Sequence, residues 1–345
     1  MRQIPKPLLF AVGIIVTVII LYYGRGLLLP LAFGGIFAML LNPVDRRLDK
    51  LGLPRYLSAL LSVSLILIIV FIFFSVFGWQ VNELLSEPEE IKEAITEKTA
   101  ETKDFLRDQF GITSEKVNQY ARKGWQNIKS NASMLLGSTT SAVSSFLLSL
   151  IYAILLLGEK RRLKIFLCKI ADDEETATET VIESGNIVQK YLTGKLLVTA
   201  ILAVAYSVGF LAAGIPYAVL LAIFAAVLSF IPYVGNMVGG GIACLITLAT
   251  GGTMTDVFLI FGIMSVAQII ESYVLTPWII GDNIDINPLF AIICVIGFTL
   301  VWGAAGSIIA LPLTGALKVV FDKTPGFRPF AFLLGNEDLE GYDTK

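Results

Sequence analysis

Long apolar runs separated by short charged loops constrain this chain more than any other feature of its sequence. A helix needs about 20 predominantly apolar residues to cross the hydrocarbon core of a bilayer. Runs near this length lie at Leu8–Tyr23, Leu27–Asn42, Tyr56–Trp79, Leu136–Leu157 and Leu196–Ala213. Further runs follow with almost no charge before Lys318, at 216–231, 236–250, 257–276, 288–302 and 304–320. We therefore expect an all-α, polytopic membrane protein.

Composition agrees with a membrane protein and excludes several other classes. The 345 residues are 55% apolar and 16% charged, whereas about 25% of the residues in a soluble domain are charged. So few charges cannot cover the surface of a soluble protein of this length. The net charge of −2 gives no reason to expect a nucleic-acid partner.

The absence of histidine removes several kinds of chemistry. Zinc sites built on histidine, Ser-His-Asp triads and histidine proton relays are all excluded. The cysteines share no metal-ligand spacing, and those inside apolar runs are interpreted as small packing residues. They are Cys168, Cys244 and Cys294. We therefore expect no cofactor, no metal site and no enzymatic activity.

Residues 80–134 carry charges of both signs and interrupt the series of apolar runs. The sequence Ser86-Glu87-Pro88-Glu89 is typical of a helix start, with Ser86 as the N-cap and Glu89 three residues later. The segment contains no catalytic motif. We expect it to form a small helical insert outside the cytoplasm.

Lysine and arginine are unevenly distributed between the loops, and this bias predicts the orientation in the membrane. Short cytoplasmic loops carry an excess of these residues. They occur near the N-terminus, at 43–55 and at 159–169, whereas the loop between the first two runs has only Arg25. We expect a multi-pass protein of the inner or plasma membrane with both termini in the cytoplasm.

The C-terminal half contains two segments in which prolines and glycines have similar spacing. Pro216 and Ile231 are as far apart as Pro288 and Gly303. In the predicted topology the two segments enter the membrane from opposite sides, so they predict an inverted repeat. Their boundaries read Gly214-Ile215-Pro216-Tyr217 to Ile231-Pro232-Tyr233-Val234-Gly235, and Ile286-Asn287-Pro288-Leu289 to Gly303-Ala304-Ala305-Gly306.

These prolines and glycines predict broken helices. Proline lacks a backbone N–H, and glycine leaves helical angles easily. Backbone groups freed at membrane depth must lie within protein or line a wet cavity, and paired interrupted segments indicate a transporter binding site. Kinked helices with glycines for close packing are the alternative. Each short pair either crosses the membrane, giving ten spans, or forms a re-entrant hairpin, giving six spans and two hairpins.

Glu271 is the most informative ionisable residue within the apolar runs. It lies late in the run 257–276, one turn after Gln268 on the same face. Acids inside spans indicate ion or proton pathways by default. The alternatives are an acid kept wet near the inner interface and a hydrogen-bonded structural group. Ser229 and Asn236 are expected to hydrogen-bond a solute. The candidate pathway residues are Glu271, Gln268, Ser229, Pro232, Tyr233, Gly235, Asn236, Gly303 and Gly306.

A polar loop precedes the last two apolar runs. It contains Asp282, Asn283, Asp285 and Asn287. Turn chemistry accounts for these residue types. A vestibule that attracts cations is the functional alternative.

Several short motifs recur in a fixed order along the chain. They are Leu41-Asn42-Pro43, Leu51-Gly52-Leu53-Pro54-Arg55, Gly214-Ile215-Pro216, Phe230-Ile231-Pro232-Tyr233-Val234-Gly235, Gln268-Ile269-Ile270-Glu271, Leu275-Thr276-Pro277 with Gly281, Asn287-Pro288-Leu289, and Gly303-Ala304-Ala305-Gly306 with Pro312. Together they resemble the AI-2 exporter (AI-2E) family of bacterial membrane proteins over nearly the whole chain. The resemblance implies cytoplasmic termini and a homo-oligomer, with a pentamer as one expected form. Family members are associated with export of the quorum-sensing signal autoinducer-2, and others with sodium(lithium)/proton antiport.

Three functional hypotheses are consistent with these features. The first is a secondary transporter that exports a small polar molecule, such as autoinducer-2, with ion coupling through Glu271. The chain has no Walker A sequence, which argues against direct drive by ATP. The second is a Na⁺(Li⁺)/H⁺ antiporter, although no adjacent carboxylate pair lies within a span. The third is a non-transporting membrane scaffold with the insert as a docking cap.

The expected partners are the lipid bilayer, a small polar solute, H⁺ or Na⁺, and further copies of the chain. The expected domains are 1–79 with the N-terminal transmembrane helices, 80–134 with the insert, 135–195 with a transmembrane helix and a cytoplasmic amphipathic segment, and 196–345 with a transport core and cytoplasmic tail.

Overall fold

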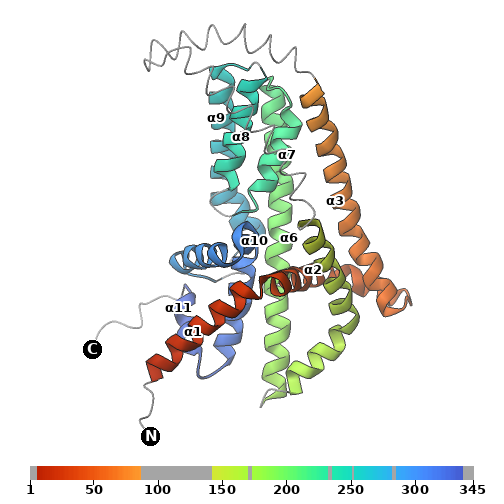
Figure 1. Cartoon of the computed structure of the whole chain (residues 1–345), viewed down its shortest axis with the longest axis vertical. Coiled ribbons are helices and arrows are strands. Elements are labelled where there is room, and N and C mark those ends of the chain that lie inside the picture. Colours follow the sequence, from red (N-terminus) through yellow and green to blue (C-terminus); the bar gives the residue numbers. More distant parts are fainter. Residues whose placement is uncertain are drawn as a thin grey trace. The chain divides into compact units, whose positions relative to one another are not determined.

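The computed structural model describes residues 6–86, 142–169, 173–231, 235–250, 252–281 and 285–336, and all regular elements in these ranges are helices (Figure 1). They are α1 (Lys6–Tyr23), α2 (Arg25–Lys50), α3 (Arg55–Ser86), the helix Ala142–Lys169, α6 (Glu174–Ala212), α7 (Ala218–Leu228), α8 (Gly235–Ala249), α9 (Met254–Ile270), the π-helix η1 (Glu271–Ile280), α10 (Pro288–Lys323) and α11 (Arg328–Leu334).

Six helices in the described ranges are long and apolar enough to cross a membrane. They are Arg25–Lys50, Arg55–Ser75, Ala142–Lys169, Glu174–Ala212, Met254–Ile280 and Pro288–Lys323. Large apolar side chains lie exposed along α3 and α6, for example Phe71 at 73% and Val204 at 64%. Lipid is the environment in which such a surface is stable, since soluble monomers rarely expose large apolar patches. The predicted all-α polytopic class is confirmed.

Two boundaries differ from the sequence prediction. The amphipathic segment and the run Leu196–Ala213 are one continuous helix, the 39-residue α6. The runs 288–302 and 304–320 lie in a single helical element, α10, whose only non-helical residue is Gly303. Most of the predicted insert, from residue 87 onward, lies outside the described residues, whereas 80–86 continue α3.

The chain forms two compact units, and each is assembled from separate segments. Unit 1 contains Met1–Ile66, Val143–Thr193 and Ile280–Lys345, and unit 2 contains Leu67–Ala142 and Gly194–Ile279. The helices α3 and α6 therefore contribute residues to both units.

The core of unit 2 joins the second half of α6 with α7, α8 and α9. Tyr206 and Phe210 on α6 are fully buried, with stacked rings 6.1 Å apart. Facing them are small residues of α7 such as Ala222 and Ala225. Small side chains let helices approach closely in a membrane, where lipid provides no hydrophobic drive for association.

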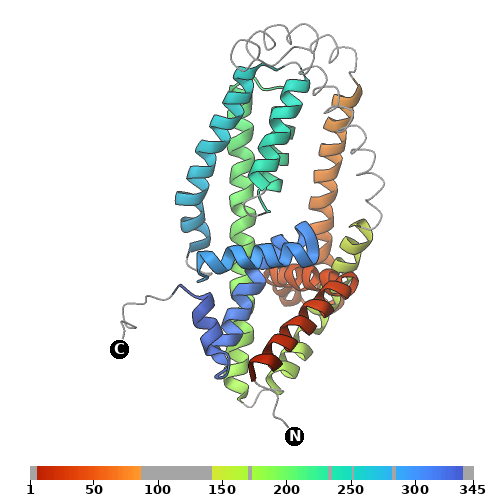
Figure 2. The same ribbon diagram turned by 60° about the vertical axis from the view of Figure 1, so that its left-hand side comes forward.

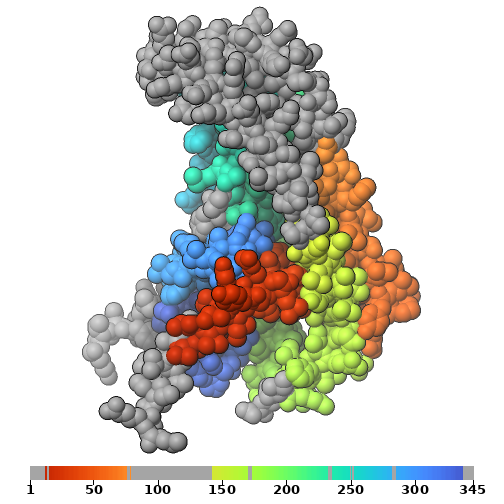
Figure 3. Space-filling model, viewed as in Figure 1, coloured from red at the N-terminus to blue at the C-terminus, as the bar shows by residue number. Residues whose placement is uncertain are grey.

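The core of unit 1 joins α1, α2, the first half of α6 and α10. Figure 3 shows α1 and α2 (red) against the first part of α10 (light blue). Trp302 on α10 donates a hydrogen bond from Nε1 to the Leu21 carbonyl oxygen at 2.9 Å. A second cluster packs α2 and α3 against the helix Ala142–Lys169, where Lys160 forms ion pairs with Asp45 and Asp49.

Candidate functional site

The short helices α7 and α8 lie side by side in unit 2 (Figure 1). Their 11 and 15 residues correspond to about 17 and 22 Å, which is less than the roughly 30 Å of the hydrocarbon core. Neither helix can cross the membrane alone. The predicted pathway residues Pro232 and Tyr233, which fall between them, lie outside the described residues.

The end of α7 and the start of α8 approach each other so closely that only glycine fits at Gly235. A Cβ atom there would lie 1.8 Å from the Leu228 carbonyl oxygen. Ser229 is buried at the end of α7, and its hydroxyl donates to the Ala226 carbonyl oxygen at 2.7 Å. The Ser229 hydroxyl hydrogen is therefore already bonded to the protein, and Ser229 Oγ could only accept a hydrogen bond from a solute.

Gly303 and Gly306 lie in α10 and belong to unit 1. Gly303 has φ 65° and ψ −154°, angles that L side chains rarely adopt. Figure 2 shows the two parts of α10 running in different directions (lighter, then darker blue). A Cβ atom at Gly306 would lie 2.1 Å from the Phe298 carbonyl oxygen. Both glycines are needed for the bend in α10.

Glu271 lies at the junction of α9 and η1 in unit 2 and is 6% exposed. Its Oε1 accepts a hydrogen bond from Lys195 Nζ of α6 at 2.9 Å. The side chains of Lys195 and Glu271 are 13% and 8% exposed, so this is a buried ion pair. Among the described residues, Glu271 Oε2 has no hydrogen-bond partner.

Lys195 is a functional candidate that sequence reasoning missed. It follows the amphipathic segment and precedes an apolar run, a position that favours an exposed interfacial residue. The one available signal was that no lysine or arginine occurs between Lys195 and Lys318. A buried acid in this stretch needs a cation, since a buried charge is stable only when it is paired.

The side-chain amides of Gln268 on α9 and Asn236 on α8 form further polar contacts near Glu271 in unit 2. Asn236 Nδ2 donates to Gln268 Oε1, and Gln268 Nε2 donates to Ser272 Oγ at 3.1 Å. Asn236 Oδ1 has no partner within the described part of the chain. The structure thus joins two predicted pathway residues from different helices, Asn236 and Gln268, and Glu271 lies one helical turn after Gln268.

A cavity of about 500 Å³ lies between α8 and α9. Its lining is mostly apolar, with Asn236, Ser265 and Gln268 as polar groups. Small-molecule sites commonly have this character, an apolar lining with few polar groups that orient the ligand. Over the residues that the structure describes, no group of three metal-binding side chains occurs, and the chemistry available is hydrogen bonding and charge.

Comparison with known proteins agrees with the resemblance carried by the sequence motifs. The model of the AI-2E family transporters matches residues 8–326. The chain is 28% identical to "Putative transport protein YueF" of Bacillus subtilis (strain 168) over 310 residues, 86% of this chain and 83% of that protein. It is 24% identical to "Putative permease PerM" of Escherichia coli (strain K12) over 316 residues, 89% of this chain and 90% of that one. It is 22% identical to "AI-2 transport protein TqsA" of the same strain over 323 residues, 92% of each chain. The chain therefore belongs to the AI-2E family of transporters.

Proposed function

We propose that this protein is a secondary transporter that exports a small polar molecule and couples export to an ion gradient through Glu271. The observation that carries the proposal is the buried Lys195–Glu271 ion pair. Glu271 lies one helical turn from Gln268, whose side chain is hydrogen-bonded to Asn236 of α8. The printed name of the relative TqsA supports autoinducer-2 as the first solute to test.

Protonation of Glu271 is the proposed coupling step. A proton on the carboxylate removes its negative charge and leaves Lys195 buried without a counter-charge. Breaking a buried ion pair costs roughly 3–5 kcal/mol, because one charge stays buried without a partner. The state with protonated Glu271 therefore favours a rearrangement that exposes Lys195 to water. Oε2, which has no partner among the described residues, is the oxygen on which the proton would arrive.

The solute path is proposed to run along the cavity between α8 and α9, where Asn236 and Gln268 present amide groups. The short α7–α8 pair and the bend of α10 at Gly303 support the proposed inverted repeat of interrupted segments. Cytoplasmic termini and a homo-oligomer belong to the same proposal. Cysteine labelling of Lys6 and Asn336 variants in sealed cells tests the orientation.

Efflux from proteoliposomes tests the coupling. Vesicles that contain the purified protein are loaded with autoinducer-2, and solute release is followed with and without an imposed proton gradient. We expect the gradient to accelerate release by the wild type and not by Glu271→Gln. Glu174→Gln, an exposed acid at the start of α6, is the control and should behave as the wild type. Equal responses of Glu271→Gln and wild type would refute coupling through Glu271.

A Na⁺(Li⁺)/H⁺ antiporter is the second candidate, because Glu271 Oε2 and Asn236 Oδ1 are buried oxygens without a described partner. Everted vesicles loaded with a pH-sensitive dye distinguish the two functions. An antiporter releases stored protons when Na⁺ or Li⁺ is added without any organic solute. Proton release that is absent, or that persists in Glu271→Gln, argues against this candidate.

A further inference from the structure

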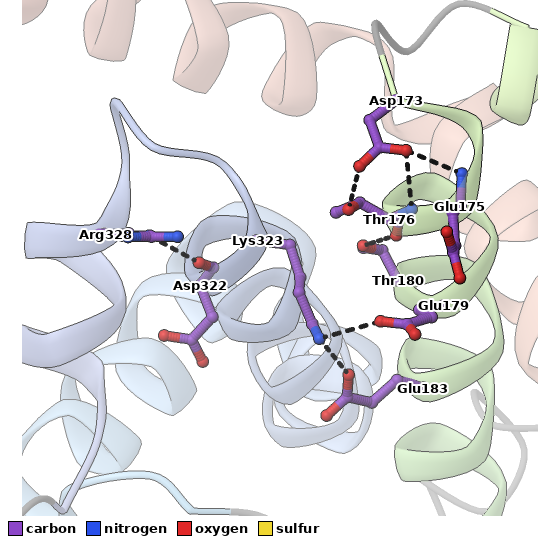
Figure 4. A network of polar contacts seen from close by, with 9 residues as sticks. All are labelled: Asp173, Glu175, Thr176, Glu179, Thr180, Glu183, Asp322, Lys323 and Arg328. Atoms are coloured by element: carbon purple, nitrogen blue, oxygen red, sulfur yellow. Dashed lines mark hydrogen bonds and ion pairs between the residues drawn. The ribbon is translucent and has the colours of Figure 1, made fainter.

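Three buried oxygen atoms of α6 and η1 in unit 2 have no hydrogen-bond partner among the described residues, namely Thr199 Oγ1, Tyr206 Oη and Glu271 Oε2. The three residues are at most 9% exposed. The charged groups between α6 and α10 in unit 1 are different, since Lys323 Nζ lies 3.5 Å from Glu179 Oε2 (Figure 4). Buried polar atoms are normally bonded to protein or to ordered water. The three oxygens therefore indicate a bound polar ligand.

Both hydroxyl groups lie on the face of α6 that carries Lys195. Thr199 follows Lys195 by four residues, and Tyr206 follows Thr199 by seven, spacings that keep side chains on one face of a helix. This face packs on α9, because Leu202 and Tyr206 share a buried cluster with Met264. The hydroxyl groups therefore point to the interface between α6 and α9.

Two contacts show that α6 and α9 run in opposite directions. Lys195 Nζ bonds to Glu271 Oε1, whereas a Cβ atom at Gly209 would lie 2.7 Å from Ile263 Cγ2. Later residues of α6 thus meet earlier residues of α9 and η1. The part of α6 between these two contacts carries both hydroxyl groups.

The directions of the side chains bring the three oxygens together. A side chain on a helix leans toward the N-terminus of its own helix. Glu271 therefore leans along α9 toward Ala267, which presents only a methyl group, and Tyr206 leans along α6 toward Thr199. Tyr206 also lies near enough to Glu271 for the two groups to interact electrostatically. The three oxygens converge on one place between α6 and α9.

We propose that an ordered water molecule binds at this place, held by Thr199 and Tyr206, and delivers the proton to Glu271 Oε2. Water can donate to the carboxylate and still bond to both hydroxyl groups, and about three hydrogen bonds are usual for a buried water. A metal cation is disfavoured here, because Lys195 already supplies the positive charge that pairs with Glu271. The inference rests on the proposed function only for the role of Glu271 in coupling.

The proton step leaves the water molecule unchanged. The water accepts a proton that comes from the acidic side of the gradient and gives one of its own protons to Glu271 Oε2. One O–H bond forms on the water, one breaks, and the carboxylate becomes neutral. Thr199 and Tyr206 are positioning residues, because they act on Glu271 through the water.

Infrared difference spectra of the full chain in lipid nanodiscs test the site directly. Spectra at acid minus neutral pH, recorded in ordinary and in heavy-oxygen water, identify bound water by its isotope shift. We expect one such band in the wild type and its loss in Glu271→Gln, Thr199→Val and Tyr206→Phe. The last two substitutions keep the shape of the side chain and remove its hydroxyl. No water band in the wild type, or a band that persists in both hydroxyl variants, overturns the proposal.

Ser207→Ala and Tyr273→Phe are the matched controls. Ser207 is next to Tyr206 on α6, but its hydroxyl already donates to the Ala203 carbonyl oxygen at 2.6 Å. Tyr273 is a tyrosine of η1 that is 79% exposed. Both variants should keep the band. Its loss in either one would assign the band to another place and would also overturn the proposal.

Gradient-driven efflux from proteoliposomes tests the role of the water in proton transfer. Tyr206→Phe should slow this efflux about tenfold, which corresponds to the loss of one hydrogen bond. Exchange of autoinducer-2 without a gradient should keep its rate. Equal gradient-driven rates for Tyr206→Phe and the wild type would overturn this role. Gradient-driven efflux that persists in Glu271→Gln would instead refute the proposed function, and the infrared band would still test the site.

Discussion

Lys195 and Glu271 place opposite charges inside unit 2, where they form a buried ion pair. Lys195→Met leaves Glu271 without its cation and should destabilise the protein by about 3–5 kcal/mol, because an unpaired buried charge remains. The double variant Lys195→Met/Glu271→Leu should recover most of this loss, since neither charge is left. Thermal unfolding in detergent measures both effects.

Lys164→Met is the control for this prediction, because Lys164 is exposed and should tolerate the change within about 0.5 kcal/mol. A double variant as unstable as Lys195→Met would show that packing, and not charge pairing, is what the lysine contributes.

The close contact at Gly235 leads to a prediction about the steric effect of one added carbon atom. Gly235→Ala places a Cβ 1.8 Å from the Leu228 carbonyl oxygen, so α7 and α8 must separate. We expect a loss of folded protein in detergent, measured by size-exclusion chromatography and thermal unfolding. Gly241→Ala on the same helix meets no atom within 4 Å and should be folded normally. Similar yields for both variants would contradict the close contact.

At the scale of single residues, the sequence predicted which polar residues belong to the candidate site, but it did not predict which residues pair with them. Gln268 and Glu271 are one turn apart on a single apolar run, so a helical period was enough to group them. Lys195 is 76 residues from Glu271, and only the packing of α6 against α9 and η1 brings the two together. Hydropathy cannot supply such a contact, because it describes each run separately.

The bend of α10 gives a prediction at the scale of the element. Gly303→Ala forces an L side chain into φ 65° and should destabilise the protein by about 1–3 kcal/mol. Gly297→Ala, also in α10, has helical angles and open space, so it should instead stabilise by up to about 1 kcal/mol. Opposite shifts of the unfolding temperature are expected. Shifts of the same sign would show that α10 is not bent at Gly303.

Helix lengths show where sequence patterns succeed and where they fail. The short apolar runs 216–231 and 236–250 predicted two short helical segments, and α7 and α8 lie at these positions. The break at Gly303 was also predicted, but there the helix resumes at once, because a single glycine can absorb the change in direction. The continuity of α6 was missed, since Lys195 resembles a helix boundary until its buried partner is known.

Across the whole molecule, each unit is built from segments far apart in the chain, and hydropathy alone does not indicate which segments pack together. Unit 1 joins residues before 67 with residues after 279. The link is carried by contacts such as Trp302 to the Leu21 carbonyl oxygen, 281 residues away in sequence. The apolar runs predicted the fold class and the motifs indicated the family, whereas these pairings required coordinates.

The stability of the whole protein in acid should depend in part on Asp285, in the loop before α10. The Lys318 ammonium beside Asp285 holds the pKa of that carboxyl below its usual value of 3.8, and the Asn336 N–H also donates to it. A carboxyl with a lowered folded-state pKa stabilises the fold fully above the unfolded value and loses this contribution as the pH falls through the folded value. Stability of the wild type should therefore fall on acidification below about pH 4.

Asp285→Asn removes this linkage, so its unfolding temperature should depend less steeply on pH below about pH 4 than that of the wild type. Part of the slope should remain, because hydrogen bonds from Thr176 and Glu175 also hold the pKa of Asp173 below its usual value. Thermal unfolding across the acid range measures both slopes, with Glu175→Gln as the control that should keep the wild-type slope. If Asp285→Asn kept that slope too, the ion pair with Lys318 would make no pH-dependent contribution to folding.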